Sequence, residues 1–298
     1  MTAPQNIDIA QTFQLEGLDV RGRFVRLGPA LDAVLEAHKY PDPVAKMLAE
    51  TLTLGAVLAS ALKYDGLFTL QVQSNGPISL LVADLTSDGA LRGYARFDET
   101  RVAQAALQDG ARVPRLLGAG HLAFTVDQGP DMERYQGITA LEGSTLAVCA
   151  QSYFRTSEQL ETAIFMATDI ASPARSGAMM VQRMPSHFVT DEAEAEDGWR
   201  RSVAIMASLT KDEALDPDLS SDELLYRLYH EDGVRAYPPH PLEHRCRCSF
   251  DKVAATLKSF PRAEITGDDG HTLVECEFCK TSYDFAPADL DDLFATRA

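Results

Sequence analysis

The sequence predicts an α+β fold with an N-terminal domain of antiparallel strands and helices, a helical linker and a small, cysteine-bearing C-terminal domain. Three observations support this prediction. Helical and strand patterns occur in blocks, acidic residues concentrate in one amphipathic helical segment, and four of the five cysteines lie in the last fifth of the chain. We place the domain boundaries at residues 1–183, 184–241 and 242–298.

The composition excludes several classes of function. The chain has 298 residues, 45% of them hydrophobic and 24% charged, which is typical of a globular protein. Its formal charge of −17 disfavours nucleic acid and anionic membranes as partners. The longest uncharged stretch, residues 66–83, is interrupted by Ser74-Asn75-Gly76-Pro77 and indicates two strands rather than a membrane span. Because the N-terminus shows no signal-peptide pattern, we expect a cytoplasmic, reducing location.

The N-terminal domain shows one long helix among strands. Asp42-Pro43 is a typical helix start, and apolar residues at helical spacing continue from it to Leu62. Apolar residues alternate with polar ones over several later segments, which predicts antiparallel strands. The segments predicted as strands are 68–72, 78–82, 91–97, 122–126, 135–140 and 164–166, and residues 145–156 are predicted as a helix.

The linker is acidic and amphipathic. Residues 184–235 contain 13 acidic and 5 basic side chains, and Ser220-Ser221-Asp222-Glu223 is a capping box that begins a short helix. A solvated connector between two domains is the alternative interpretation of this segment. The sequence Tyr237-Pro238-Pro239-His240-Pro241 excludes further helix. The apolar positions at helical spacing are Trp199, Val203, Met206, Leu209, Leu224 and Leu228.

The C-terminal cysteines form two close pairs, Cys246-x-Cys248 and Cys276-x-x-Cys279. Two such pairs separated by a loop can supply the four thiolates of a tetrahedral zinc site. The domain is short and poor in large apolar residues, and a metal often stabilises domains of this kind. We therefore predict one zinc ion on Cys246, Cys248, Cys276 and Cys279. The histidines at 240, 244 and 271 are rival ligands by proximity only.

Two alternatives use the same cysteines. A static zinc-ribbon adaptor is disfavoured by the Cys-x-Cys spacing and by Lys280, which follows Cys279 where such sites usually have a glycine. The basic residues Arg245, Arg247 and Lys280 should also favour thiolates that react with oxidants. A thiol-disulfide oxidoreductase would use Cys276-x-x-Cys279, but no thioredoxin-like βαβ pattern surrounds this pair.

The chain resembles the redox-regulated 33 kDa heat-shock protein family of bacteria over essentially its full length. The matching residues are Leu228-Tyr229-His230-Glu231, Cys246-x-Cys248-Ser249, Cys276-x-x-Cys279, Glu133-Arg134-Tyr135-Gln136-Gly137 and Tyr153-Phe154-x-x-Ser157-Glu158-Gln159-Leu160. The sequence departs from the family pattern at His244, where family members carry an aromatic residue two positions before the first cysteine.

The resemblance implies a chaperone that needs no ATP and holds unfolding client proteins. It implies that peroxide or hypochlorous acid, together with mild unfolding, joins Cys246 to Cys248 and Cys276 to Cys279. Zinc is then released, the linker unfolds and the protein forms a homodimer. We expect the linker residues Trp199, Val203, Met206, Leu224 and Leu228 to become exposed and to bind clients.

Other motifs do not predict an enzyme. Cys149 lies in an apolar helical segment, where cysteine is usually an inert core residue. Gly118-x-Gly120-x-x-Ala123 resembles a dinucleotide-binding motif, but it precedes a strand instead of joining a strand to a helix. The dipeptide Gly-Lys does not occur, which excludes a standard P-loop.

Overall fold

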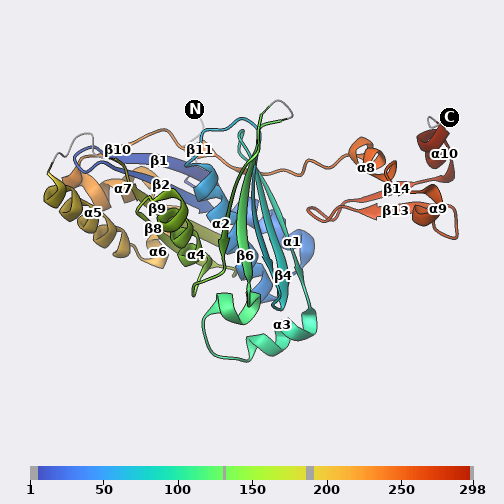
Figure 1. Ribbon diagram of the computed structural model, residues 1–298, viewed down its shortest axis with the longest axis horizontal. Coiled ribbons are helices and arrows are strands. Elements are labelled where there is room, and N and C mark those ends of the chain that lie inside the picture. The colour runs from blue at the N-terminus through green and yellow to red at the C-terminus, as the bar shows by residue number, and fades with distance from the viewer. Residues whose placement is uncertain (1–5, 130–131, 186–190, 296–298) are drawn as a thin grey trace. The chain divides into compact units, whose positions relative to one another are not determined.

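The computed structural model describes residues 6–129, 132–185 and 191–295 (Figure 1). The chain divides into two compact units, one that extends to His244 and one that begins at Arg245. Its mixed sheets and helices confirm the predicted α+β class. Within the described residues, no helix is long and apolar enough to cross a membrane. The division into three domains stays a prediction.

The first sheet is buried on both faces. Its strand order is β10-β1-β2-β9-β8, with β11 added to β1, and all of these pairs are antiparallel. Nearly every side chain of β2 and β9 is buried, so neither strand alternates between polar and apolar residues. The strands are β1 (Ile9–Leu15), β2 (Val20–Leu27), β8 (Thr162–Asp169), β9 (Arg175–Arg183), β10 (Val234–Ala236) and β11 (His240–Pro241).

The second sheet has one apolar and one polar face. Its order is β12-β5-β4-β3-β6-β7, and it is antiparallel except for the short β12, which runs parallel to β5. Phe68, Leu70 and Val72 of β3 are fully buried, whereas the residues between them are less buried. This alternation confirms the predicted strands. They are β3 (Leu67–Ser74), β4 (Ile78–Thr86), β5 (Ala90–Phe97), β6 (Gly120–Asp127), β7 (Tyr135–Ala140) and β12 (Glu243–His244).

The long predicted helix lies between the two sheets. It is α2 (Asp42–Ala59), which begins with a proline in its first turn and contacts strands of both sheets (Figure 1). The core around it includes Cys149, which is fully buried on α4 (Leu146–Tyr153). Burial raises the pKa of this thiol to about 11, so Cys149 is the inert core residue that its sequence context predicts. The remaining helices of the body are α1 (Pro29–His38) and α3 (Glu99–Ala106).

The linker helices cover the opposite face of the first sheet. They are α5 (Glu192–Ala207), α6 (Lys211–Leu215) and α7 (Ser221–Tyr229), coloured yellow to orange in Figure 1. The predicted capping box is present at Ser220 and Glu223, and a second one at Thr210 and Glu213 begins α6. The body therefore has a sheet packed between α2 on one side and the linker on the other.

The second unit is small and has little core. It contains α8 (Phe250–Leu257), α9 (Arg262–Ile265), the hairpin β13 (Thr272–Glu275) and β14 (Ser282–Phe285), and α10 (Pro287–Ala295). In the described part of this unit, the buried apolar cluster consists of Leu257, Phe285 and Leu290. A unit with so few buried residues needs another source of stability, as its composition suggested.

Two segments differ from the expectations. The helix expected over residues 145–156 ends at Tyr153, and a π-helical turn (Phe154–Glu158) follows before Gln159 adopts a left-handed conformation with φ of 53°. The Tyr237–Pro241 segment contains no helix, as expected, but its last two residues pair with β1 as β11. Proline can occupy such an edge strand because the amide it lacks is not needed there.

Candidate metal centre

The four C-terminal cysteines converge on one point in the second unit. Cys246 and Cys248 lie in the segment before α8, and Cys276 and Cys279 lie in the turn between β13 and β14. All four sulfurs lie within 4.8 Å of one another. The Sγ atoms of Cys246 and Cys276 are 3.8 Å apart, and those of Cys248 and Cys279 are 3.4 Å apart. The structure thus brings together the whole predicted ligand set.

This arrangement fits a tetrahedral metal. With Zn–S bonds of about 2.3 Å, the edge of a ZnS₄ tetrahedron is about 3.8 Å, close to the observed sulfur separations. Each cysteine is half-buried, so the sulfurs are shielded from water but remain accessible. Within the described residues, the group of close metal-ligand atoms contains these four cysteines and no histidine. The site therefore suits a soft or borderline divalent cation.

Local backbone geometry positions the second pair. The Lys280 amide donates to the Cys276 carbonyl at 2.9 Å, and the Cys276 amide donates to the Thr281 carbonyl at 2.9 Å. Lys280 has a φ of 59°, the left-handed conformation that explains why glycine is common at this place in related turns. Because the pair lies in a β-turn and not at a helix N-terminus, it lacks the setting that activates thioredoxin-like cysteines.

Without a metal, burial favours the thiol form of two cysteines in the cluster. Burial raises the pKa of Cys248 to about 12 and also raises the pKa of Cys276, and the neighbouring thiols add to both shifts. The flanking basic residues do not offset this effect, and the Lys280 ammonium instead pairs with Glu275 at 2.8 Å. The expectation that they favour thiolates is not supported. A bound divalent cation would deprotonate these thiols through its own charge.

The nearby histidines have other partners or positions. His271 Nδ1 lies 2.9 Å from a carboxylate oxygen of Asp284, and this contact raises its pKa. His240 lies on β11 in the first unit. The Nε2 atom of His244 is buried without a hydrogen bond among the described residues, and burial lowers the pKa of this side chain.

Comparisons with known proteins identify the family. The family model described as Hsp33 protein matches residues 8–286. The chain belongs to the Hsp33 family. It is 42% identical to the 33 kDa chaperonin of Caulobacter vibrioides (strain NA1000 / CB15N), with 94% of this chain and 95% of that protein covered. It is 37% identical to the 33 kDa chaperonin of Ectopseudomonas mendocina (strain ymp), with 97% and 95% covered.

A solved structure shares the fold. The crystal structure of the 33 kDa chaperonin (Hsp33) from Thermotoga maritima superposes with a TM-score of 0.77 at 21% identity, covering 97% of this chain and 98% of that one. The resemblance to the 33 kDa heat-shock protein family that the sequence indicated is thus confirmed. The family and the names of these relatives support a chaperone function for this chain.

The linker residues chosen from the sequence all face the first sheet. Trp199, Met206 and Leu224 are buried there, and Val203 and Leu228 are partly buried in the same apolar cluster. Eight buried side chains of the sheet and Leu18, in the turn between β1 and β2, form the other side of this cluster. The sheet residues are Phe13, Leu15, Val20, Phe24, Ala163, Ala167, Met179 and Val181. The amphipathic linker is therefore a packed element and not a solvated connector.

A buried arginine anchors the linker, which sequence analysis did not detect. Arg26 of β2 has no exposed surface, and its guanidinium donates to the backbone carbonyls of Ala214 at 2.9 Å and Leu219 at 2.7 Å. It also donates to the carbonyls of Glu213 and Asn6, and burial lowers its pKa to about 10. The Arg26 side chain thus supplies hydrogen-bond donors to backbone carbonyls at the end of α6 and in the turn before α7.

Ion pairs tie the acidic part of the linker to the body. Arg183 of β9 pairs with Glu161, Glu192 and Glu196 at 2.9 Å each. Within the linker, Arg201 of α5 pairs with Asp232, whose side chain is almost fully buried, at 2.7 Å. The negative charge of this segment is therefore partly compensated in the docked linker. No pattern in a single sequence marks Arg26 or Arg183 as the partner of a segment far along the chain.

Proposed function

We propose that this protein is a redox-regulated holdase that binds unfolding client proteins without ATP. The observation that supports this most is the pairing of a four-cysteine cluster, in a unit with almost no core, with a linker that covers an apolar sheet face. The cluster can respond to oxidants, and the linker can cover or uncover a surface for clients. Both parts are needed for a switch.

In the reduced form, the four cysteines would hold one zinc ion. Zinc would join the two cysteine pairs and supply folding free energy of about 10–16 kcal/mol, more than three buried apolar side chains can provide. Cys246, Cys248, Cys276 and Cys279 are the proposed ligands, and the hairpin and the segment before α8 would be fixed by them. The protein's own contacts keep α5–α7 on the first sheet in this state.

Oxidation removes the ligands in pairs. Cys246 and Cys248 form one S–S bond, and Cys276 and Cys279 form another. Each pair of zinc-bound thiolates would lose two electrons, and one peroxide molecule per pair would take up these electrons and two protons from solvent to give two waters, while the zinc ion is released. With mild heat, the linker then leaves the sheet and exposes Trp199, Val203, Met206, Leu224 and Leu228 with the sheet face beneath them. Clients bind there, and the oxidised protein forms a homodimer in the cytoplasm.

This proposal assigns no catalytic role to the cysteines. The oxidised protein should suppress light scattering by a thermally unfolding client in the absence of ATP, and the reduced, zinc-loaded protein should not. Trp199 is the only tryptophan in the chain and is buried between α5 and the first sheet, so its emission should shift to the red on activation. Equal suppression by both forms would exclude the switch, and repeated turnovers of insulin reduction would support an oxidoreductase instead.

The ligand set is tested separately. Cys246→Ser should lose zinc to a competing chelator that leaves the parent protein loaded, because the tetrahedron lacks one thiolate. Cys149→Ala is the matched control, since Cys149 lies in the core of the first unit. Tight, stoichiometric zinc in Cys246→Ser would show that the ligand set is wrong.

A further inference from the structure

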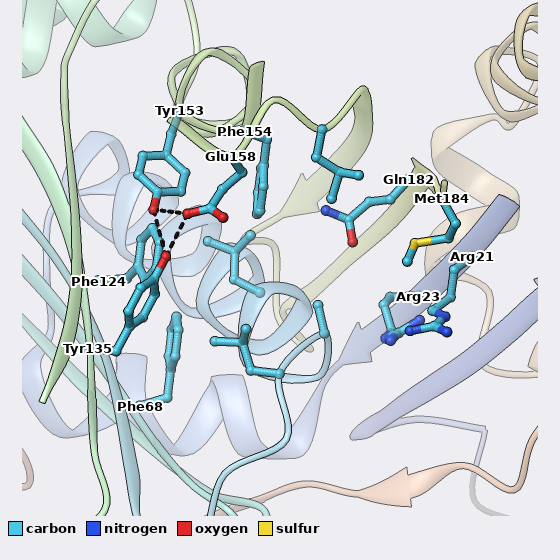
Figure 2. A pocket seen from close by; sticks show the side chains of 14 residues that line it. Arg21, Arg23, Phe68, Phe124, Tyr135, Tyr153, Phe154, Glu158, Gln182 and Met184 are labelled. Carbon is cyan, nitrogen blue, oxygen red and sulfur yellow. Dashed lines mark hydrogen bonds between the residues drawn. The ribbon is translucent and has the colours of Figure 1, made fainter. Parts of the chain in front are cut away.

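A cavity of about 250 Å³ in the first unit is not used by the proposed switch (Figure 2). Residues of both sheets, of α2 and of the segment after α4 line it. Its walls include the apolar side chains Leu58, Phe68, Phe124, Phe154 and Leu160. The volume is just below the range of about 300–1,000 Å³ that is usual for drug-sized ligands, so the cavity would suit a small molecule or one side chain.

One end of the cavity is closed by a hydrogen-bonded network. The Tyr135 hydroxyl donates to Glu158 at 2.6 Å and lies 3.0 Å from the Tyr153 hydroxyl, which also donates to Glu158 (Figure 2). These bonds lower the pKa of Glu158, and burial raises the pKa of both tyrosines. At neutral pH this end therefore has one negative charge, which disfavours a second anion there.

A glycine keeps this network in place. A Cβ atom at Gly137 of β7 would lie 2.4 Å from the Phe124 ring and 2.6 Å from the Tyr153 hydroxyl oxygen. The strand can approach the ring and the network only without a side chain at this position. Gly137, Tyr135, Tyr153 and Glu158 all belong to the two body motifs that the redox switch does not explain.

The other end of the cavity has two arginines and no acid. Arg21 and Arg23 are two residues apart on β2, so they point to the same face of the strand, and Figure 2 shows them away from Glu158. Arg23 is only 7% exposed, and it donates through Nε to the Ser60 carbonyl and through Nη1 to the Gly22 carbonyl. Among the described residues, its Nη2 has no hydrogen-bond partner and neither arginine has an ion pair.

This end differs from two other sites with buried or half-buried arginines. Arg92 pairs with Asp84 at 2.7 Å, and Arg26 has four carbonyl acceptors. Burial, together with repulsion from Arg21, lowers the pKa of Arg23 to about 10. A desolvated cation beside a second cation is unfavourable unless an anion joins them.

We propose that the cavity binds a small apolar carboxylate. Its apolar group packs against Phe68, Phe124 and Phe154, and its carboxylate lies between Arg21 and Arg23. Guanidinium groups bind carboxylates with strong, charge-assisted hydrogen bonds, and the negative charge of Glu158 at the far end fixes this orientation. A free small acid and the C-terminal carboxylate of a polypeptide that ends in an apolar residue share this chemistry. The site does not depend on the redox state of the cysteines.

The test is calorimetric titration of the reduced, full-length, zinc-loaded protein. The probes are 2-naphthoate, its uncharged analogue 2-naphthamide, and the tripeptide acetyl-Gly-Gly-Phe with a free carboxylate. We expect saturable binding of 2-naphthoate to one site, and binding of 2-naphthamide that is at least about tenfold weaker. If the tripeptide displaces 2-naphthoate, polypeptide ends are ligands; if it does not, the ligand is a free acid.

Two variants locate the site. Arg21→Gln should weaken 2-naphthoate binding about tenfold without changing the binding of 2-naphthamide, and it should fold because Arg21 is exposed and makes no bond among the described residues. Arg101→Gln is the matched control, because Arg101 is an exposed arginine on α3 that does not line the cavity. No saturable binding of either acid, equal affinity for the amide, or unchanged affinity in Arg21→Gln would each overturn the proposal.

Discussion

The linker and the second unit are stabilised by different means. The linker contributes eight buried apolar residues to a cluster shared with the first sheet, whereas the buried apolar cluster in the described part of the second unit has three. The linker also has buried polar anchors at Arg26 and Asp232. The second unit instead has four converging sulfurs. One region is thus stabilised by packing, whereas the other has a cysteine cluster that suits a metal.

This difference bears on how the switch would work. Loss of the metal would remove most of what folds the second unit, but the contacts that fix α5–α7 lie within the first unit. Oxidation alone should therefore unfold the second unit first. Release of the linker should need a second input, such as heat, that weakens packing. Under the proposed function, a chaperone with this arrangement would respond to oxidation and unfolding stress together.

Metal removal should have the largest effect on stability. It should distinguish the second unit from the linker. Chelation of the reduced protein should unfold the second unit, because it loses about 10–16 kcal/mol of metal-binding free energy. Hydrogen exchange should show lost protection in β13 and β14 and retained protection in α2 and β9. The emission of Trp199 should stay unchanged at 25 °C. Simultaneous loss of protection in α5–α7 at that temperature would contradict the comparison.

Substitution of the buried Arg26 should have the next largest effect on stability. Arg26→Met leaves buried carbonyls of the linker without a donor, which should destabilise linker docking by about 4 kcal/mol. Urea unfolding followed by Trp199 emission measures this change. Arg101→Met is the control, with an expected change below about 0.5 kcal/mol. If both variants unfold at the same urea concentration, Arg26 is not an anchor.

A core substitution tests the apolar part of the linker interface. Leu224→Ala removes a fully buried side chain of α7 and should cost about 3 kcal/mol, because it leaves a cavity against the sheet. Tyr226→Ala on the same helix is the control, since that ring is 66% exposed. Trp199 emission should shift to the red at a lower temperature in Leu224→Ala only. An equal shift in both variants would mean that helix propensity, rather than packing, controls docking.

Removal of the helix cap at Ser220 should have the smallest effect on stability. Ser220→Ala removes the hydroxyl that accepts from the Glu223 amide at the start of α7, which should cost about 1 kcal/mol. Ser208→Ala serves as the control, because that exposed hydroxyl only donates to a carbonyl of its own helix. Thermal unfolding monitored by circular dichroism compares the two. A larger loss in Ser208→Ala would show that the capping box contributes little.

The sequence predicted the elements whose patterns are local. The proline and apolar spacing of α2, the alternation of β3 to β7 and the capping box of α7 are all readable over a few residues. The four metal ligands were also predictable, because their spacing is itself the signal. Strands β2 and β9 were not predicted, because helices on both faces bury nearly all their side chains and remove the alternation.

Long-range partners were not predictable. Arg26 lies on a strand near the N-terminus, and its acceptors in the linker lie 187–193 residues later, so no local pattern connects them. Nothing local to the acidic segment shows that Arg183 pairs with Glu192 and Glu196 in the docked linker. The cavity depends on Tyr135, Tyr153 and Glu158 meeting from separate elements, and spacing alone does not show this.

The linker is attached to the first sheet at both ends. Arg183 ends β9, and β10 begins at Val234, so the 50 residues between them form a loop closed by strand pairing. As long as β10 stays paired, detached helices remain near their own binding face at an effective concentration on the order of millimolar. Under the proposed function, a client would compete with the tethered linker helices for the sheet face. Intramolecular competition of this kind would allow a bound protein to be released by linker re-docking, without nucleotide hydrolysis.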